Sequence, residues 1–245
     1  MHSRRGLILA GLLTLLIGLL VMVPARVAYH FVAPPGIAVA GIQGSVWHGA
    51  AREASAGGVY LRDLQWQLQP LAVLTGKLAY TVSAKPVSGF IDSRISIGLS
   101  GVATLTDLNA SLPLSLFAGP LRIRGLSGSA SLNFERIEIT DGTASAADGV
   151  MQVANLIVPI VDRNSLGGYK AEFFTQNNGV TASVEDTDGV VDLAGSLQLL
   201  PDRSYQFIAQ VVVKPQTPPS VQQQLKFLPP PNERGQQEIR LEGVL

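Results

Sequence analysis

The histidines of this chain are the first place to look for catalysis, because the sequence has no cysteine to act as a nucleophile or metal ligand. They are His2, His30 and His48, so a Ser-His-Asp triad would have to combine His48 with distant partners. No Gly-x-Ser-x-Gly turn, P-loop or Gly-x-Gly-x-x-Gly opening is present. A histidine-based metal site lacks ligands. We therefore predict no enzyme activity, no catalytic or metal-binding residue and no cofactor.

The acidic group Glu185-Asp186-Thr187-Asp188-Gly189 carries oxygen ligands of the kind that calcium prefers. It lacks the spaced loop and distant glutamate of an EF-hand. Between two expected strands, Asp188-Gly189 favours a hairpin turn instead. Over the whole chain, 18 basic and 18 acidic residues cancel, so charge gives no reason to expect nucleic acid as a partner.

Rare residues gather in the stretch GIQGSVWHG, residues 41–49, which holds one of the two tryptophans. On a half-buried strand such a ring most often packs into the core. The pattern of Ile or Leu, any residue, Gly, then Ser or Val recurs along the chain, and we expect its glycines to mark bends, bulges or close approaches. The stretch is predicted to be the first strand of a sheet, bent at Gly44 with Trp47 packed beneath it. The structural candidates are Gly44, Trp47, Trp66, Gly101, Gly128, Gly195 and Gly243.

Strand signals dominate the elements that must position these residues. Alternating apolar and polar residues, bounded by Gly, Pro, Asp and Asn, are typical of an all-β domain. Short helices are predicted within residues 112–119 and 217–228, where Thr217 and Pro218 suit a helix start. Turns are expected at Asp141-Gly142 and Asp148-Gly149 and over residues 177–179. The predicted strands cover residues 59–68, 78–83, 93–99, 102–108, 120–124, 130–139, 150–158, 169–176, 180–184, 190–199, 205–213 and 237–245.

The N-terminus carries an uncharged apolar run over residues 6–23. As a helix it would be about 27 Å long, close to the bilayer's hydrocarbon thickness of about 30 Å. Arg4 and Arg5 place residues 1–5 in the cytoplasm by the positive-inside rule. We therefore expect a cytoplasmic tail (1–5), a transmembrane anchor (6–23), a linker (24–36) and a periplasmic all-β domain (37–245). A cleaved signal peptide is the alternative, although the run is longer than a usual h-region.

The chain resembles the type II secretion system protein N family in several blocks. They are the short tail and single anchor, then GIQGSVWHGAA, then LRDLQWQLQPLAVLTGKLAY, and finally GVVDLAGSLQLLPDRSYQFIAQVVVKP and GQQEIRLEGVL. This resemblance implies an accessory component of the cell inner membrane that supports export of folded proteins across the outer membrane of a Gram-negative cell. It implies other secretion-system components as partners and carries no enzymatic residues.

Two functions remain open at this stage. The first is a structural or assembly role, in which the anchor tethers a twisted antiparallel sheet whose edges contact other secretion components. The second is lipid handling, because the β-rich part is also similar to AsmA-like proteins, whose curved sheets shelter lipid. Apolar residues on both faces of strands such as ANLIVPIV and YQFIAQVVV would favour the second function. A periplasmic hydrolase is the weakest alternative.

Overall fold

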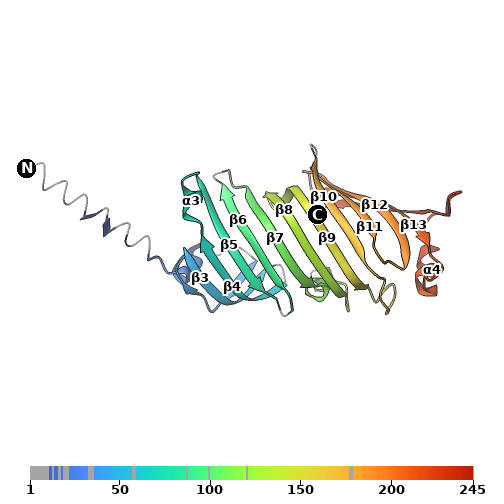
Figure 1. Cartoon of the computed structure of the whole chain (residues 1–245), viewed down its shortest axis with the longest axis horizontal. Coiled ribbons are helices and arrows are strands. Elements are labelled where there is room, and N and C mark those ends of the chain that lie inside the picture. Colours follow the sequence, from blue (N-terminus) through green and yellow to red (C-terminus); the bar gives the residue numbers. More distant parts are fainter. Residues whose placement is uncertain are drawn as a thin grey trace, which may run out of the picture.

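The computed structural model describes residues 11–12, 14–15, 18, 22–32, 36–56, 59–86, 88–98, 100–119, 121–176 and 179–244. Its described strands form one 14-stranded sheet, and from β3 onward each strand pairs with the next strand in the chain (Figure 1). All strand pairs are antiparallel. The prediction of a mainly β fold built on an antiparallel sheet is confirmed.

Most of the strands are longer than the usual length of about five to six residues, and two of them have the bounds that the sequence predicts. β4 covers Val59–Leu68 and β10 covers Tyr169–Gln176, as expected from their alternation. The others are β1 (Ile37–Ala40), β2 (Gln43–Gly44), β3 (His48–Ala56), β5 (Lys77–Lys85), β6 (Phe90–Gly98), β7 (Ala103–Pro113), β8 (Ser127–Thr140), β9 (Thr143–Ile157), β11 (Gly179–Asp186), β12 (Val191–Leu199), β13 (Ser204–Val213) and β14 (Gln237–Val244).

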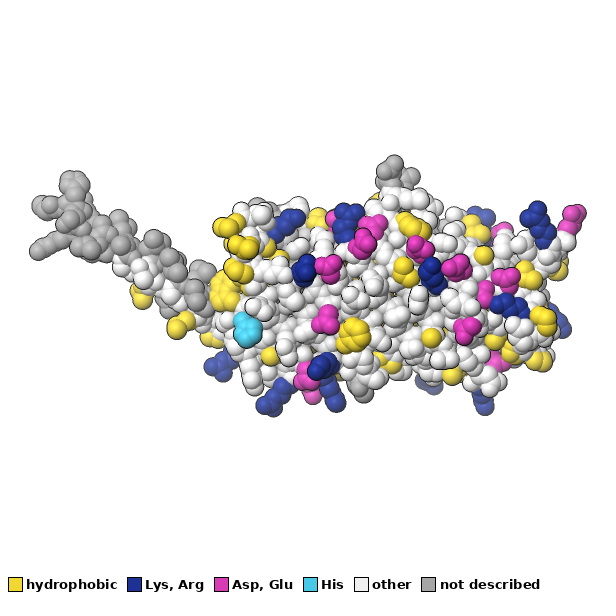
Figure 2. All heavy atoms as spheres, in the orientation of Figure 1, with side chains coloured by type: hydrophobic (Ala, Val, Ile, Leu, Met, Phe, Trp, Pro, Cys, Tyr) yellow, Lys and Arg dark blue, Asp and Glu magenta, His cyan; other side chains and the backbone are white. Residues whose placement is uncertain are grey.

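The two faces of the sheet differ sharply in polarity. Register partners share a face, so the pairs Leu132↔Met151 and Asn133↔Val150 lie on opposite sides. Followed from strand to strand, one face is apolar and includes Leu105, Leu108, Leu132, Phe134, Ile137, Met151, Phe173, Leu197 and Phe207. The other face is mostly polar, with Thr104, Asn109, Ser131, Asn133, Arg136, Gln152, Lys170, Glu172, Ser183 and Gln198. Figure 2 shows acidic and basic side chains spread over one side of the molecule.

Short helices lie toward the two ends of this sheet and in the β7–β8 connection at its middle. The helical prediction for residues 112–119 is confirmed by the 3₁₀ helix η1 (Leu114–Phe117), and that for 217–228 by α4 (Pro219–Leu225). Two more helices were not predicted. In the range expected to be a linker, α2 (Ala25–Val32) is helical, and α3 (Pro70–Val73) lies in the β4–β5 connection.

Helix α4 covers the apolar face at the C-terminal end of the sheet. Val221 and Leu225 of α4 pack with Val191, Val211 and Leu166 in one buried cluster. The sequence predicts that the run ANLIVPIV belongs to a strand with apolar residues on both faces, and the structure differs from this prediction. β9 ends within it, and Val158 and Val161 fold over this same cluster. A second buried cluster, around Phe134, Ala147 and Val180, lies on the apolar face at mid-sheet.

Two predicted elements are wrong for reasons that lie outside the local sequence. Residues 121–124, within the expected strand 120–124, form turns, and Arg122 has φ +56°. Asp148-Gly149, expected to be a turn, lies inside the long strand β9. Here the β8–β9 register shifts between Phe134 and Arg136, so the pair marks a bulge. The prediction for Asp141-Gly142 is correct, whereas most of 177–179 lies outside the described residues.

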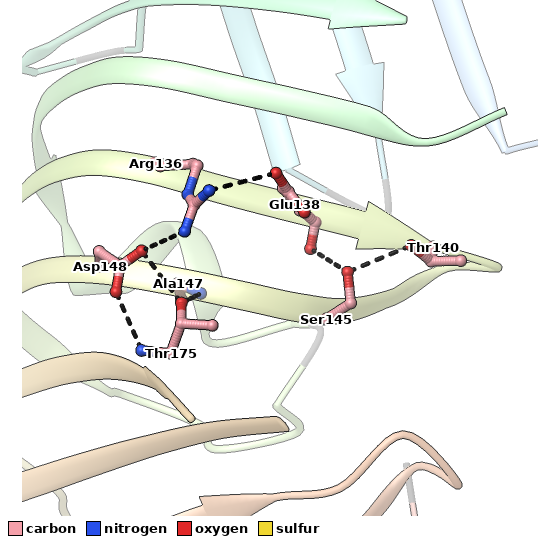
Figure 3. A network of polar contacts seen from close by, with 7 residues as sticks. All are labelled: Arg136, Glu138, Thr140, Ser145, Ala147, Asp148 and Thr175. Carbon is pink, nitrogen blue, oxygen red and sulfur yellow. Dashed lines mark hydrogen bonds and ion pairs between the residues drawn. The ribbon is translucent and has the colours of Figure 1, made fainter. Parts of the chain in front are cut away.

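A network of polar contacts holds this bulge together (Figure 3). Beyond Phe173↔Gly149 the β9–β10 ladder ends, and Thr175 donates its backbone N–H to Asp148 Oδ1 at 2.9 Å and its hydroxyl to Oδ2 at 3.0 Å. Arg136 Nη2 lies 3.1 Å from the same Oδ2. Partial burial raises the pKa of Asp148, but the Thr175 bonds and the Arg136 charge outweigh burial and lower it. Side-chain bonds thus replace backbone bonds where the sheet bends.

Contacts between segments that are not neighbours in the sheet show that the sheet is curved. Helix η1 contacts both β4 and β8, which are separated in the sheet by β5, β6 and β7. Arg203, in the β12–β13 turn, donates to the carbonyl oxygen of Asp141, in the β8–β9 turn, at 2.7 Å. β9 and β11 also approach each other across β10. The sheet is therefore curled across its width as well as twisted.

Candidate functional site: an apolar pocket beneath helix α2

An apolar pocket lies between α2 and the apolar face of strands β4 to β6. Its volume is about 520 Å³, within the range of about 300–1,000 Å³ that is usual for ligand sites. It is open to solvent on one side. Burial raises the pKa of Tyr80, whose phenol ring lines the wall. The lining residues are Ala25, Ala28, Tyr29, Val46, Trp66, Tyr80, Val82 and Ile95.

Trp66 shapes one wall of this pocket through its contact with a glycine. Gly49 is the register partner of Trp66 in the β3–β4 pair, and a Cβ on Gly49 would lie 2.4 Å from Cζ2 of the ring. The ring can therefore lie flat over β3, which a larger residue would prevent. Its Nε1–H donates to the carbonyl oxygen of Ser45 at 3.2 Å. This bond joins β4 to the loop that carries Val46.

Helix α2 is held over the pocket by four backbone and side-chain contacts. Pro24 forms an isolated bridge with Ser45, and the N–H of Val46 donates to the carbonyl oxygen of Val23 at 3.1 Å. Tyr29 donates its hydroxyl to the carbonyl oxygen of Ile37 at 2.9 Å and accepts from the N–H of Val39 at 3.1 Å. The phenol oxygen thus fixes α2 to the edge strand β1. Residues predicted to be a linker instead form the roof of the pocket.

The stretch GIQGSVWHG is not the single first strand that the sequence predicts, although the chain does turn at Gly44. The first strand is β1, and residues 41–49 form the two-residue strand β2, a bend and the start of β3. Gly44 has φ +85°, a left-handed conformation that suits glycine, and its Cβ would lie 2.5 Å from the carbonyl oxygen of His48. Trp47 lies in the bend and is half-buried, and its carbonyl oxygen accepts from Leu68 N–H at 2.7 Å.

Of the other four candidate glycines, Gly101 lies in the β6–β7 turn, and Gly128, Gly195 and Gly243 lie farther along the sheet from the pocket. Gly101 has φ +80° in the turn before β7, and a Cβ there would meet nothing within 4 Å. Gly128 lies in β8 at a register shift, where a Cβ would meet carbonyl oxygens of β9 at 2.8–2.9 Å. A Cβ on Gly195 would lie 2.6 Å from Ala209 Cβ, and one on Gly243 would lie 2.8 Å from the Tyr205 ring. Each belongs to a different part of the sheet.

The titratable groups form structural contacts rather than a reactive constellation. His48 is exposed at the start of β3. Among the described residues, no group of three or more His, Asp or Glu side chains could hold a metal ion. In the acidic group after β11, Asp186 accepts from Lys214 Nζ at 2.6 Å and from Leu193 N–H at 2.8 Å. Partial burial raises the pKa of Asp186, but these two bonds outweigh it and lower the pKa.

Sequence reasoning identified Trp66 but missed the residues that make its pocket. Tyr29 was assigned to a linker, and Gly49 was not singled out. A signal for Gly49 would have followed from a strand predicted over residues 48–56, because its hairpin with 59–68 places this glycine opposite Trp66. Glycine beside a cross-strand aromatic residue is a recurring pair in sheets. No comparable signal exists for Tyr29, because its partners lie on β1.

Comparison with known proteins identifies the family to which this chain belongs. The pattern of the family "Type II secretion system (T2SS), protein N" matches residues 35–240, which cover the sheet from β1 to the first half of β14. The chain belongs to this family. The type II secretion system protein N of Vibrio cholerae serotype O1 is 28% identical over 244 residues, with 94% of each chain covered. That of Aeromonas hydrophila is 25% identical over 234 residues, with 92% of each covered. No solved structure matches the chain.

Most of the expected membrane anchor is not among the residues that the structure describes. Residues 1–5 and most of 6–23 are outside the described residues. Within the described part of the chain, no helix combines the length and apolarity needed to cross a membrane. The described part begins to contact the sheet at Val23, whose carbonyl oxygen accepts from Val46 N–H, and at Pro24, which is paired with Ser45 in an isolated bridge.

Proposed function

We propose that this chain is an accessory component of the type II secretion system that supports the export of folded proteins across the outer membrane. Family membership over residues 35–240 is the observation that carries this proposal. The relatives bear the name of the system and align over almost their whole length. An assembly role also agrees with a long sheet whose polar face is rich in paired charges, such as Arg136 with Asp148 and Lys170 with Glu172.

A gene deletion tests this function directly. Loss of the chain should leave exported proteins in the periplasm, and the tagged chain should co-purify with other subunits of the system. Complementation with the wild-type gene is the control. Normal secretion together with no co-purifying subunit would refute the proposal. A gene position among secretion-system genes would support it independently.

The anchored topology is part of the same proposal. Residues 6–23 would cross the inner membrane with residues 1–5 in the cytoplasm and the sheet in the periplasm. A reporter that is active only in the periplasm should be active when fused after Leu245 and inactive when fused before Met1. The mass of the purified protein separates the alternatives, because a cleaved signal peptide would remove the apolar run.

Strand addition is the proposed mode of contact with other components. β14 ends the sheet and, in the described part of the chain, pairs on one side only, with β13. An edge of this kind can accept a strand of a partner through backbone hydrogen bonds. Glu238, Arg240 and Glu242 lie on one face of β14 and would set which partner residues fit. Cross-linking from an exposed position such as Val244 should capture a secretion subunit.

Lipid handling is the second candidate function, and the one-sided sheet is the observation that favours it. A sheet with one continuous apolar face normally needs a second layer to cover that face. Among the described residues, helices and loops rather than a second sheet lie on it. The pocket beneath α2 is lined by apolar and aromatic side chains. Native mass spectrometry of the purified protein should then detect bound phospholipid, and a lipid-free protein would argue against this function.

A further inference from the structure

Five large hydrophobic side chains are exposed together at one corner of the sheet. Leu71, Val73 and Leu74, in α3 and at its C-terminal end, are 77%, 47% and 83% exposed. Leu78 of β5 and Ile97 of β6 are 49% and 50% exposed and are register partners. Figure 2 shows hydrophobic side chains gathered at the corner where Figure 1 places α3. We call these five residues the apolar rim.

The apolar rim runs without interruption into the pocket beneath α2. Leu78 is two residues before Tyr80 on the same face of β5, and Ile97 is two residues after Ile95 on β6. Two residues along a strand cover about 6.6 Å, so Leu78 and Ile97 are each the next side chain along from a pocket side chain. Tyr80 and Ile95 are themselves register partners in the pocket wall. A ligand that reaches the rim can therefore enter the pocket along one apolar surface.

The rim also lies where the apolar N-terminal segment joins the sheet. Residues 6–23 end at Val23, whose carbonyl oxygen bonds to Val46 N–H at 3.1 Å. The next residue, Trp47, bonds to Leu68 through its carbonyl oxygen at 2.7 Å. α3 begins two residues after Leu68. Two hydrogen bonds and a few residues of backbone therefore connect the end of the apolar segment to the rim.

The chemistry of the rim suits a lipid surface. Its two connections, residues 69–77 (QPLAVLTGK) and 98–102 (GLSGV), contain no acidic residue. Their single charge is that of Lys77, which is exposed beside Leu78 and can meet lipid phosphate. Exposed leucines next to a basic residue are the pattern by which proteins lie in a membrane interface. This end of the apolar face carries the features of a lipid contact rather than those of a charged protein interface.

We propose that the apolar rim enters the periplasmic leaflet of the inner membrane and that a phospholipid acyl chain passes over it into the pocket beneath α2. The proposal rests on the anchored topology and on the lipid-handling function proposed above. It adds two features to that function. The rim is the entrance, and the pocket lined by Trp66, Tyr80 and Ile95 holds the acyl chain.

Trp66 offers a direct test, because it lines the pocket and the chain has two tryptophans. Trp47→Phe leaves Trp66 as the single tryptophan, whose emission is excited selectively over that of the tyrosines. The full-length variant is reconstituted in phosphatidylcholine and phosphatidylglycerol vesicles, with the phosphatidylcholine either plain or brominated in its acyl chains. We expect brominated lipid to quench Trp66 emission at least twofold. The same quenching should fall at least twofold in Leu71→Ser/Leu74→Ser, whose substituted residues are exposed and leave the fold intact, as thermal melts will verify.

Two further variants separate the entrance from the pocket. Phe227→Ser is the matched control, because Phe227 is 86% exposed after α4, at the other end of the sheet, and it should leave quenching unchanged. Ala28→Phe fills the pocket and should abolish quenching with the rim intact. Absent quenching in the starting protein, or equal quenching in the rim variant and the control, would overturn the proposal. If the rim variant and the control are quenched equally, phospholipid detected by native mass spectrometry would refute only the rim as entrance and leave the lipid-handling function intact. Absence of bound phospholipid would refute both proposals.

Discussion

Gly49 lies under the ring of Trp66, so a methyl group at this position tests how closely the ring packs against β3. A Cβ on Gly49 would lie 2.4 Å from Cζ2 of Trp66 and 2.7 Å from the carbonyl oxygen of Gln43. Carbon atoms in contact normally lie about 3.5–4.0 Å apart, so the ring must move by about 1 Å. Overpacking of this kind costs about 1–3 kcal/mol of the free energy of unfolding. For a domain of this size, Gly49→Ala should lower Tm by about 2–12 °C.

Thermal melts of the full-length protein in detergent, followed by near-ultraviolet circular dichroism, measure this loss. Gly98→Ala is the matched control, since a Cβ at the end of β6 would lie 3.6 Å from Ser100 Oγ, an ordinary contact. It should change stability by less than about 0.5 kcal/mol. The near-ultraviolet signal of Trp66 should change in Gly49→Ala and stay as it is in Gly98→Ala.

A double-mutant cycle identifies the ring as the cause. Trp66→Phe removes Cζ2, so Gly49→Ala should cost at least about 0.5 kcal/mol less in that background. The remaining cost comes from Gln43, whose carbonyl oxygen is close in both backgrounds. Equal losses in the two backgrounds would show that the ring does not rest on Gly49. No loss in the wild-type background would refute the packing of this whole end of the sheet.

Three further substitutions test other parts of the structure. The pKa of Asp186 is lowered from 3.8, so its bond with Lys214 stabilises the fold above that value and the stability is lost as the pH falls through the lowered pKa. Lys214→Met should therefore cost about 1.5–3 kcal/mol at pH 7 and flatten the acid limb of a stability profile; a limb unchanged by the substitution would contradict this. Tyr29→Phe removes both bonds between α2 and β1, so protease cleavage within α2 should become faster while the sheet signal in circular dichroism stays constant. Gly195→Ala should cost about 1–3 kcal/mol, because its Cβ would lie 2.6 Å from Ala209 Cβ, and Ala209→Gly should recover part of that loss.

The sequence alone identified the class of fold because a strand's apolar alternation is a local property. The bounds of β4 and β10 follow from residues within each strand, and α4 follows from its proline start and the spacing of Val221 and Leu225. The family was also recognisable from the sequence, through blocks that cover most of the chain, and the family match over residues 35–240 confirmed it.

Tertiary structure decided the features that depend on a partner distant in the chain. Asp148-Gly149 has the composition of a turn, but Arg136 on β8 and Thr175 on β10 hold it as a bulge inside β9. The sequence could show that Trp47 and Trp66 are both large and apolar. It could not show that Gly49 would leave space for Trp66 alone to line the pocket.

The roof of the pocket shows the same limit. Residues 25–32 carry an amphipathic helical pattern, but the pattern is short and follows an apolar segment, so the sequence indicates a linker. Helix α2 forms against the sheet, where Tyr29 bonds to β1 and the carbonyl oxygen of Val23, just before the helix, accepts from Val46 N–H. Packing of an apolar face, more than intrinsic propensity, stabilises so short a helix. The order of strands along the chain was therefore set locally, whereas the curvature of the sheet, the covered pocket and the exposed rim arose from contacts between distant segments.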